Sequence, residues 1–291
     1  MKHAFLIMAH QYYEQVDKLI DVLDHERVDI FIHIDKKSPK HKFPSCKYSR
    51  LIRIPSIRTN WGSFSLVECE LRLLEEALKT DNYCFIHLIS GQDLPIKSID
   101  YILTFFDSNN ERNFIHYDIA SMSEENEDRI KYYFPFLNFG PRRRSSFFYL
   151  AGTAAVIIQK ILRVDRTKRY LGSYKSGSQW WSIKPDLARF VVSQRELISK
   201  LFKFTMCDEM FMQTLIYNSE FFDTVYLKEV DDMHANQRLI DFKRGAPHIW
   251  TMDDIEELKH SDLLFARKFD ETVDSKVIDE VIRICKRADV L

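Results

Sequence analysis

Polar side chains lie at four points of the chain where a run of apolar residues ends. The four groups contain, in chain order, His10, then Asp35 with Lys37, then residues 90–95 with Asp93, and finally Asp118. The carboxyl ends of parallel strands meet at one edge of an open sheet, and α/β proteins bind their ligands there. If the four runs are strands, these groups converge, although His10 taken alone is better explained as a structural hydrogen-bonding residue. The spacing therefore predicts a polar ligand site at the edge of a sheet.

A second kind of chemistry is suggested by the acidic pair Asp208 and Glu209, which comes shortly before a strongly apolar run. One interpretation is electrostatic, because carboxylates in the first turn of a helix are favoured by about 0.3–1 kcal/mol. The other is that Glu209 is a general base, since a positioned carboxylate can remove a proton from a reacting hydroxyl. By spacing alone, the helix-terminus interpretation is the better supported of the two.

The sequence lacks the common motifs that bind phosphate or metal ions. Its seven glycines are too sparse for a G-x-G-x-x-G turn, and no Walker loop is present. No two Asp residues are separated by one residue, and there is no H-E-x-x-H motif, so we expect no metal site and no metal cofactor. A bound diphosphate would depend on cationic side chains late in the chain. The candidates are Arg238, Lys243, Arg244, Arg267 and Lys268.

Composition narrows the class of protein. The chain has 291 residues, of which 45% are hydrophobic and 29% charged, which is enough for a packed core. The 42 Lys and Arg balance the 43 Asp and Glu, so nothing supports nucleic-acid binding. Five cysteines without a C-x-x-C pair favour a reducing compartment. Neither a signal peptide nor an apolar run of about 20 residues is visible. We expect a cytoplasmic protein, with peripheral contact at the inner face of a membrane as an extension of that expectation.

Strand and helix patterns alternate through the first half of the chain, which predicts an α/β fold with a mostly parallel central sheet flanked by helices. Strands are predicted at 4–9, 29–34, 51–54, 83–90 and 113–117, and helices at 11–23, 66–78 and 98–106. In the second half a strand is predicted at 179–183, and helices within 185–202 and at 207–218, 253–258 and 277–286.

Residues 119–150 interrupt this alternation. They are first acidic, then aromatic, and then basic at Arg142, Arg143 and Arg144. We interpret the segment as an excursion from the sheet that forms one wall of a cleft. The basic triplet is either a solvated loop or a contact for an anionic acceptor or a membrane surface.

Six segments occur in an order that is known from one family. They are residues 33–38, 61–66, 85–97, 177–181, 208–215 and 264–269. In this order they resemble the core-2/I-branching family of glycosyltransferases, which also includes the peptide O-xylosyltransferases. The resemblance implies a GT-A-like fold, a nucleotide-sugar donor, inversion at the anomeric carbon and independence of divalent metal.

The resemblance also implies roles for individual residues. Glu209 matches the catalytic base, and Lys268 matches the basic residue that neutralises the donor diphosphate. Arg238 and Arg244 are alternatives for a second cation. The other donor-binding candidates are His10, Asp35 and Lys37 near the uridine, and Asp93, Ser178 and Trp180 around the sugar. Of Trp180 and Trp181 we expect one at the ligand and one in the core, because neighbouring strand residues face opposite ways.

The acceptor side matches less well. Arg129 and Lys131 are the candidates for acceptor contacts. The chain lacks the membrane anchor, stem region and framework cysteines of the animal enzymes, so it resembles a bacterial, cytoplasmic member. We expect one catalytic domain over residues 1–291, with a nucleotide-binding half at 1–118 and an acceptor-binding and catalytic half at 119–291.

The expected activity is transfer of a sugar from a UDP-sugar to a hydroxyl of a glycan or lipid-linked oligosaccharide, in β linkage and without metal. GlcNAc is the expected sugar, with xylose as the alternative. Two other functions stay open on the same fold, a nucleotide-sugar hydrolase and a non-catalytic protein that binds a carbohydrate or nucleotide.

Overall fold

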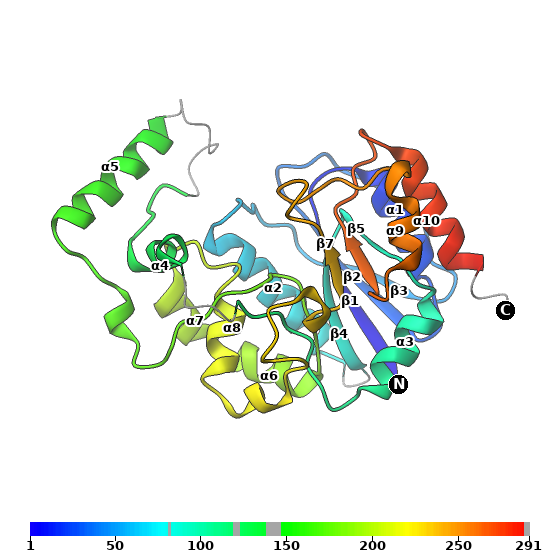
Figure 1. Cartoon of the computed structure of the whole chain (residues 1–291), viewed down its shortest axis with the longest axis horizontal. Coiled ribbons are helices and arrows are strands. Elements are labelled where there is room, and N and C mark those ends of the chain that lie inside the picture. Colours follow the sequence, from blue (N-terminus) through cyan, green and yellow to red (C-terminus); the bar gives the residue numbers. More distant parts are fainter. Residues whose placement is uncertain (81–82, 119–122, 138–146, 288–291) are drawn as a thin grey trace.

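The computed structural model, which describes residues 1–80, 83–118, 123–137 and 147–287, is built around a five-stranded sheet. The strands are β1 (Lys2–Ala9), β2 (Val28–Ile34), β3 (Arg50–Arg53), β4 (Tyr83–Ser90) and β6 (Ser182–Ile183). Their order is β3-β2-β1-β4-β6, and only β6 runs antiparallel to its neighbour (Figure 1). The predicted α/β fold with a mostly parallel sheet is confirmed, and it is consistent with a GT-A-like fold.

Helices cover both faces of this sheet. Neighbouring residues of β1 belong to different cores, with Phe5 and Ile7 in one cluster and Leu6 and Met8 in the other. Such continuous apolar strands are typical of parallel sheets covered on both sides. The first cluster includes residues of α1 (Tyr13–Leu23), α3 (Ile99–Ser108) and α10 (Ser275–Arg287). The second includes residues of α2 (Phe64–Ala77), α6 (Pro185–Ser193), α7 (Arg195–Phe202) and α8 (Phe211–Tyr217).

A second, three-stranded sheet brings together segments that are far apart in the sequence. It consists of β5 (Asp93–Pro95), β8 (Phe265–Arg267) and β7 (Arg238–Ile240), in that order. In its register Asp93 pairs with Arg267, and Arg238 pairs with Phe265. The sequence did not predict this sheet, because strands of three residues are too short to show a periodic pattern.

Several predicted boundaries are wrong. α8 begins at Phe211, so Asp208 and Glu209 lie in a turn before the helix and not in its first turn. Residues 185–202 contain a helix as predicted, and a second one follows it after Gln194. The strand predicted at 113–117 forms only isolated bridges, and the one predicted at 179–183 shortens to two residues. In each case tertiary contacts override a short local pattern.

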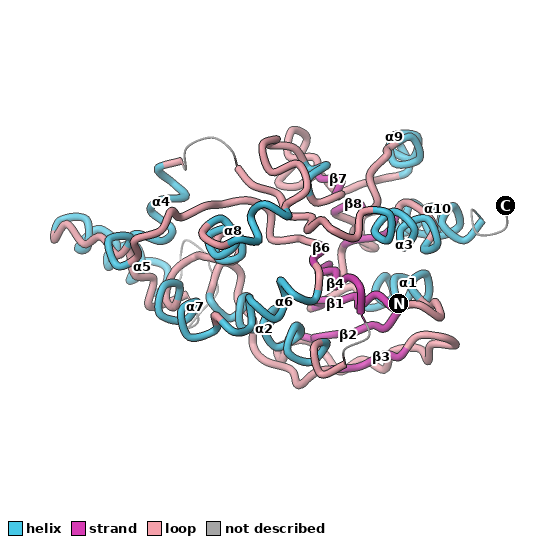
Figure 2. Tube along the Cα trace, turned by 90° about the horizontal axis from the view of Figure 1, so that it is seen from below, coloured by secondary structure: helices cyan, strands magenta, loops and turns pink. Residues whose placement is uncertain are grey.

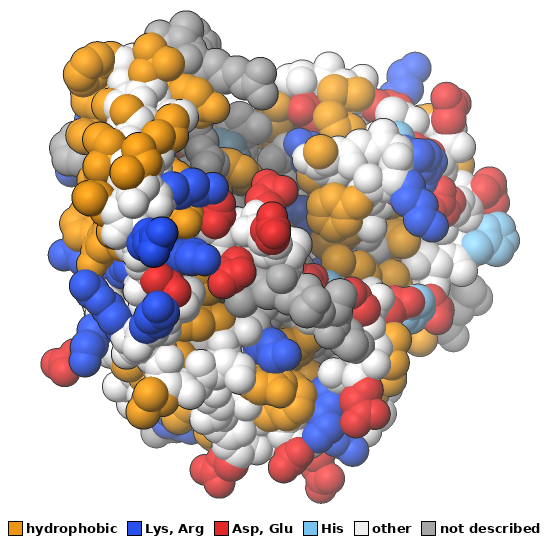
Figure 3. Space-filling model, turned by 60° about the vertical axis from the view of Figure 1, so that its left-hand side comes forward, with side chains coloured by type: hydrophobic (Ala, Val, Ile, Leu, Met, Phe, Trp, Pro, Cys, Tyr) orange, Lys and Arg blue, Asp and Glu red, His pale blue; other side chains and the backbone are white. Residues whose placement is uncertain are grey.

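The excursion from the sheet contains α4 (Glu124–Lys131) and α5 (Phe147–Ile161), which lie at the end of the molecule opposite α10 (Figure 2). Apolar side chains dominate the surface over α5 (Figure 3). Arg142, Arg143 and Arg144 lie outside the described residues. No described helix has the length and apolarity needed to span a membrane. The remaining short elements are α9 (Ile255–His260) and 3₁₀ turns at Thr167–Arg169, Glu220–Thr224, Met233–Ala235 and Met252–Asp254.

Three buried polar side chains, His3, His87 and Ser182, form a line of hydrogen-bonding contacts through the core. His3 Nδ1 and His87 Nε2 are 2.9 Å apart, and His87 Nδ1 lies 2.8 Å from the Ser182 hydroxyl. Burial lowers the pKa of His3 to about 4 and that of His87 well below its usual value. Burial likewise lowers the pKa of His33 to about 4. These rings are therefore neutral in the folded protein at pH 7.

We expect folding stability to fall as the pH drops from about 6.5 to 4. In that range the unfolded chain binds protons that the buried rings do not, so each histidine lowers the free energy of unfolding by up to about 1.4 kcal/mol per pH unit. Urea unfolding at pH 7.5 and pH 5.5 measures this loss. His3→Gln should show a smaller loss than the wild type, whereas His260→Gln, at an exposed histidine, should match the wild type. A stability that is flat over this range would contradict the assignment.

Candidate active site

A cavity of about 780 Å³ opens at the carboxyl edge of the parallel strands. Each of the four predicted polar groups contributes to its lining, through His10, Asp35, Ser90 and Asp118 respectively. The opposite walls are formed by residues 176–180, by the turn at 208–209 and by residues 267–268. The four polar groups therefore converge as predicted, although only the first three follow strands, since residues 113–117 before Asp118 form isolated bridges.

Asp35 and Lys37 form one end of the cavity, directly after β2. The Asp35 carboxylate accepts hydrogen bonds from the backbone amides of Lys37 at 2.7 Å and Thr59 at 3.1 Å. Burial alone would raise the pKa of Asp35, but the hydrogen bonds from Thr59 and Lys37 outweigh it and lower that pKa. The Lys37 ammonium donates to the Thr59 carbonyl at 2.6 Å. This end of the cavity thus offers an ionised carboxylate and a partly exposed cation to a ligand.

Glu209 lies across the cavity, with its carboxylate held from α4. Arg129 Nη1 donates to Glu209 Oε2 at 2.8 Å, and Arg129 Nη2 lies 3.3 Å from Asp208 Oδ1. A further hydrogen bond from Arg129 Nε to the Met206 carbonyl fixes the plane of the guanidinium. The Glu209 side chain is 47% exposed, so part of the carboxylate faces the open cavity. This arrangement suits a base that must stay ionised and reach a ligand.

Lys268 brings a cation to the cavity from the end of β8. Its backbone is held by Trp250 and His248, through hydrogen bonds of 3.1 and 3.2 Å. The pKa of His10 is lowered mainly because surrounding protein partly desolvates the ring, while Lys37 and Lys268 oppose and Asp35 favours its protonation. His10 and the two lysines therefore share one electrostatic environment, which is suited to an anionic group.

Arg238 lies beneath the cavity and is not part of its lining. Its guanidinium is fully buried, donates to the Asn236 carbonyl at 2.8 Å and to the Ser182 hydroxyl at 3.2 Å, and stacks 4.2 Å from the Phe265 ring. Burial lowers the pKa of Arg238 to about 9. This side chain supports the floor of the site from below.

Arg244 and Lys131 also lie outside the lining residues. Arg244 pairs with Asp241, and with Asp254 at 2.6 Å and Glu257 at 2.7 Å. Its loop nevertheless reaches the cavity, because residues 246 and 247 line it. Lys131 lies 3.8 Å from Glu127 on its own helix.

Asp93 is a support for the wall and not part of the lining. It is almost fully buried, accepts from the Ser90 amide at 2.7 Å and pairs with Arg267 at 2.9 Å. Arg267, which the resemblance did not assign to the site, lines the cavity and stacks 4.3 Å from the Trp180 ring. Trp180 lines the cavity and Trp181 is fully buried in the core, which is the split that strand alternation predicts.

Ser178 and its neighbours form a wall that is packed against the chain at His116. The Ser178 amide donates to His116 Nδ1 at 3.2 Å, and the Gly177 amide donates to the Glu209 carbonyl at 3.0 Å. Gln179, which the sequence analysis did not single out, also lines the cavity and donates to Glu70 on α2 at 2.8 Å. Burial raises the pKa of Glu70 well above its usual value, so a neutral carboxyl holds this amide. The sequence did not predict this contact, because no periodic pattern in α2 distinguishes Glu70 as the partner of Gln179.

Two groups of described side chains have atoms close enough to share a metal ion. The first, His116, Asp118 and Asp231, lies at the cavity. His116 Nδ1 accepts from the Ser178 amide, so the proton of the neutral ring is on Nε2, which donates to Asp231 Oδ1 at 3.0 Å. No ring lone pair is left for a metal in that tautomer.

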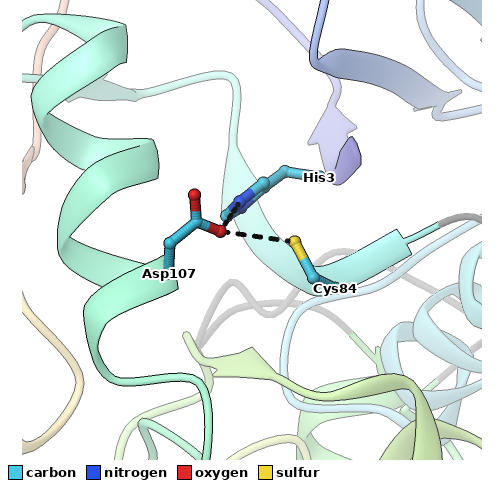
Figure 4. A group of neighbouring side chains, drawn as sticks. All are labelled: His3, Cys84 and Asp107. Atoms are coloured by element: carbon cyan, nitrogen blue, oxygen red, sulfur yellow. Dashed lines mark hydrogen bonds and ion pairs between the residues drawn. The ribbon is translucent and has the colours of Figure 1, made fainter. Parts of the chain in front are cut away.

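The second group, His3, Cys84 and Asp107, lies at the opposite edge of the sheet, at the amino ends of β1 and β4 (Figure 4). Asp107 lies between the imidazole and the thiol, and its second oxygen pairs with Arg27 at 2.6 Å. Burial and then Asp107 raise the pKa of the Cys84 thiol, so it keeps its proton. A protonated thiol and a carboxylate already neutralised by Arg27 are poor metal ligands.

The fold is an α/β sheet with a polar cavity at its carboxyl edge, which is where proteins of this class bind their ligands. The chain belongs to the Core-2/I-Branching enzyme family of glycosyltransferases, whose model matches residues 3–264.

Curated relatives of the chain are xylosyltransferases from animals. It is 21% identical to a xylosyltransferase of Ciona intestinalis over 96% of this chain and 33% of that protein. It is 22% identical to xylosyltransferase oxt of Drosophila melanogaster over 94% of this chain and 32% of that protein. The identity to human xylosyltransferase 2 is 22%, over 95% of this chain and 33% of the relative. The chain therefore spans about one third of the length of these relatives.

The cavity wall at Gly177 leaves no room for a side chain, which can be tested. A Cβ atom there would lie 2.0 Å from the His116 carbonyl oxygen. We expect Gly177→Ala to lower the free energy of unfolding by about 1–3 kcal/mol, because backbone atoms on both sides must move. Thermal unfolding measures the effect.

Gly152→Ala is the matched control, since a Cβ atom at Gly152 meets nothing within 4 Å. In the middle of α5 it should leave stability unchanged or raise it by up to about 1 kcal/mol. Equal melting temperatures for Gly177→Ala and Gly152→Ala would show that the backbone at His116 moves aside without a loss of stability.

Proposed function

We propose that this protein is an inverting glycosyltransferase that moves a sugar from a UDP-sugar to a hydroxyl group of a glycan or lipid-linked acceptor. The observation that carries this proposal is the pairing of Glu209 with Arg129 at the edge of a cavity that also contains Lys268. The Glu209 carboxylate and the Lys268 ammonium therefore border the same open space. Family membership supports the reaction type, and the wall of polar strand-end residues supports a nucleotide sugar as the ligand.

The reaction assigns one task to Glu209. Its carboxylate accepts the proton of the acceptor hydroxyl while that oxygen forms a bond to the anomeric carbon. The bond from this carbon to the diphosphate breaks on the opposite side, so UDP leaves with the bonding electron pair and the new linkage is β. Arg129 orients the Glu209 carboxylate, and we propose that it contacts the acceptor only through this carboxylate.

The leaving diphosphate is neutralised, in our proposal, by side chains without a divalent metal. Lys268 is the main cation, and Lys37 on the uridine side adds positive charge. Arg244 is better placed than Arg238 to assist, because its loop borders the cavity whereas the Arg238 guanidinium is sealed below it. Arg267 completes the cationic wall next to Trp180. Preorganised cations of this kind stabilise charge that develops in the transition state.

The donor sugar is proposed to be GlcNAc or xylose. The names of the relatives favour xylose, whereas GlcNAc is the sugar expected from the sequence resemblance. Ser178 and Trp180, which line the cavity, are the side chains that we propose contact the sugar. A nucleotide-sugar hydrolase is the rival enzyme, and it would release sugar from the donor without an acceptor.

Glu209→Gln should lower kcat by about 10²- to 10⁴-fold, because the amide cannot accept the proton of the acceptor hydroxyl. Its affinity for UDP should be unchanged, since the proposed partner of the Glu209 carboxylate is the acceptor hydroxyl and not UDP. Transfer assays with UDP-GlcNAc and UDP-xylose, with calorimetry for UDP, measure both quantities.

The control for this variant is Glu229→Gln, at an exposed glutamate outside the cavity lining. It should behave as the wild type. Normal turnover in Glu209→Gln would remove this residue from the role of base, and sugar release without acceptor would identify a hydrolase.

Lys268→Ala should weaken UDP binding by about 1.5–3 kcal/mol, which is roughly ten- to a hundredfold in Kd, because a charge-assisted contact to the diphosphate is lost. Calorimetry measures the change in Kd for UDP, with Lys276→Ala on the exposed face of α10 as the control.

EDTA should leave wild-type transfer unchanged. A strict requirement for Mn²⁺ would contradict the proposal that side chains alone neutralise the diphosphate.

A further inference from the structure

Helix α5 is apolar, yet it has no buried residue. Its sequence FFYLAGTAAVIIQKI contains Lys160 as the only charged residue. Phe147 is 76% exposed and Ile161 is 74% exposed. A helix that is apolar on all sides is normally buried in a core or in lipid. The described part of the chain therefore does not provide the environment that the composition of α5 requires.

The two sides of α5 face different surroundings. Its inner side closes an apolar groove of about 600 Å³ together with Phe134, Phe136 and Leu137. Its outer side carries exposed residues at helical spacing, which lie along one stripe. This outer stripe consists of Phe147, Leu150, Ile158, Ile161 and Leu162.

The segment that follows the outer stripe is basic. Residues 160–169 contain five Lys or Arg and one acidic residue. Arg163, Lys168 and Arg169 are exposed, whereas Arg166 is buried against the Tyr133 ring. Cationic side chains gather below the apolar surface of α5 (Figure 3). Exposed cations beside an exposed apolar stripe fit the surface of a bilayer that contains anionic lipid.

We propose that α5 docks the protein onto an anionic phospholipid bilayer. The outer stripe inserts at the boundary between headgroups and acyl chains, and Arg163, Lys168 and Arg169 contact the lipid phosphates. A helix of this length measures about 22 Å, which is shorter than the roughly 30 Å hydrocarbon core, so α5 lies along the surface and does not span it.

This docking places the cavity near the lipid. The groove beneath α5 and the cavity share Lys37 and Trp61 in their linings, so they adjoin each other. A lipid-linked acceptor would find its reactive sugar next to the cavity while its chain stays in the bilayer. The docking itself does not rest on the proposed transfer reaction, because it involves neither Glu209 nor Lys268.

Flotation of the whole protein with vesicles tests the proposal without donor or acceptor. Vesicles of phosphatidylcholine with phosphatidylglycerol should carry the protein to the top of the gradient, and pure phosphatidylcholine vesicles should carry less. High salt should weaken the binding, because it screens the phosphate contacts. Ile158→Glu should lower the bound fraction by about tenfold or more, since a carboxylate is costly at the acyl boundary.

Val273→Glu is the matched control, because Val273 and Ile158 are both 55% exposed and lie on different surfaces. It should float as the wild type, and unchanged melting temperatures should show that both variants fold. The proposal is overturned if the wild type floats with neither vesicle, if both vesicles bind it equally, or if Ile158→Glu floats as the wild type. A dimer seen by light scattering without lipid, and lost in Ile158→Glu, would assign the stripe to a second copy instead.

Discussion

The ion pair between Arg129 and Glu209 is the contact on which the candidate site depends. It joins α4, in the excursion from the sheet, to the turn before α8. The Arg129 side chain is only 16% exposed, so the attraction is screened less than at an open surface, while Glu209 keeps one side toward the cavity. Asp208 adds a second carboxylate to the same guanidinium at 3.3 Å. A carboxylate held in this way is oriented before any ligand arrives, which reduces the reorganisation that binding requires.

The arginines and lysines near the cavity divide into supports and contacts according to their burial. Arg238 is fully buried, and its Nη2 nitrogen donates to the Leu88 and Trp181 carbonyls and the Ser182 hydroxyl, so it holds β7 against β4 and β6. Arg267 is partly buried, because Asp93 pairs with one side of its guanidinium and the Trp180 ring covers its face. Lys268 continues the same strand into the cavity. Arg238, Arg267 and Lys268 lie in or next to one small sheet. How far each side chain extends from the core decides whether it supports the cavity from below or lines it.

The sequence was sufficient to predict the parallel sheet and the edge where the cavity forms. Long apolar strands such as β1 and β4 show their burial in their composition, and the polar groups after them must meet at one edge. The three-residue strands β5, β7 and β8 were missed because nothing periodic marks them. Asp93 and Arg238 were expected at the ligand. Instead each pairs with β8, Asp93 opposite Arg267 and Arg238 opposite Phe265, and both are buried behind the cavity lining. The position of Glu209 in a turn was missed for a similar reason, since acidic residues before an apolar run are typical of a helix start.

The scarcity of glycine has a structural counterpart in how this cavity is built. Phosphate loops rely on glycines so that backbone amides can approach a ligand, whereas here Gly177 serves the packing of one wall against the His116 carbonyl. His116 in turn accepts the Ser178 amide and so fixes the backbone beside Trp180. The wall is thus rigid and contributes shape, and the charge comes from side chains on other elements. Because shape and charge arise from different segments, substitutions in the cationic segment should alter the charge of the cavity without disturbing the wall that shapes it.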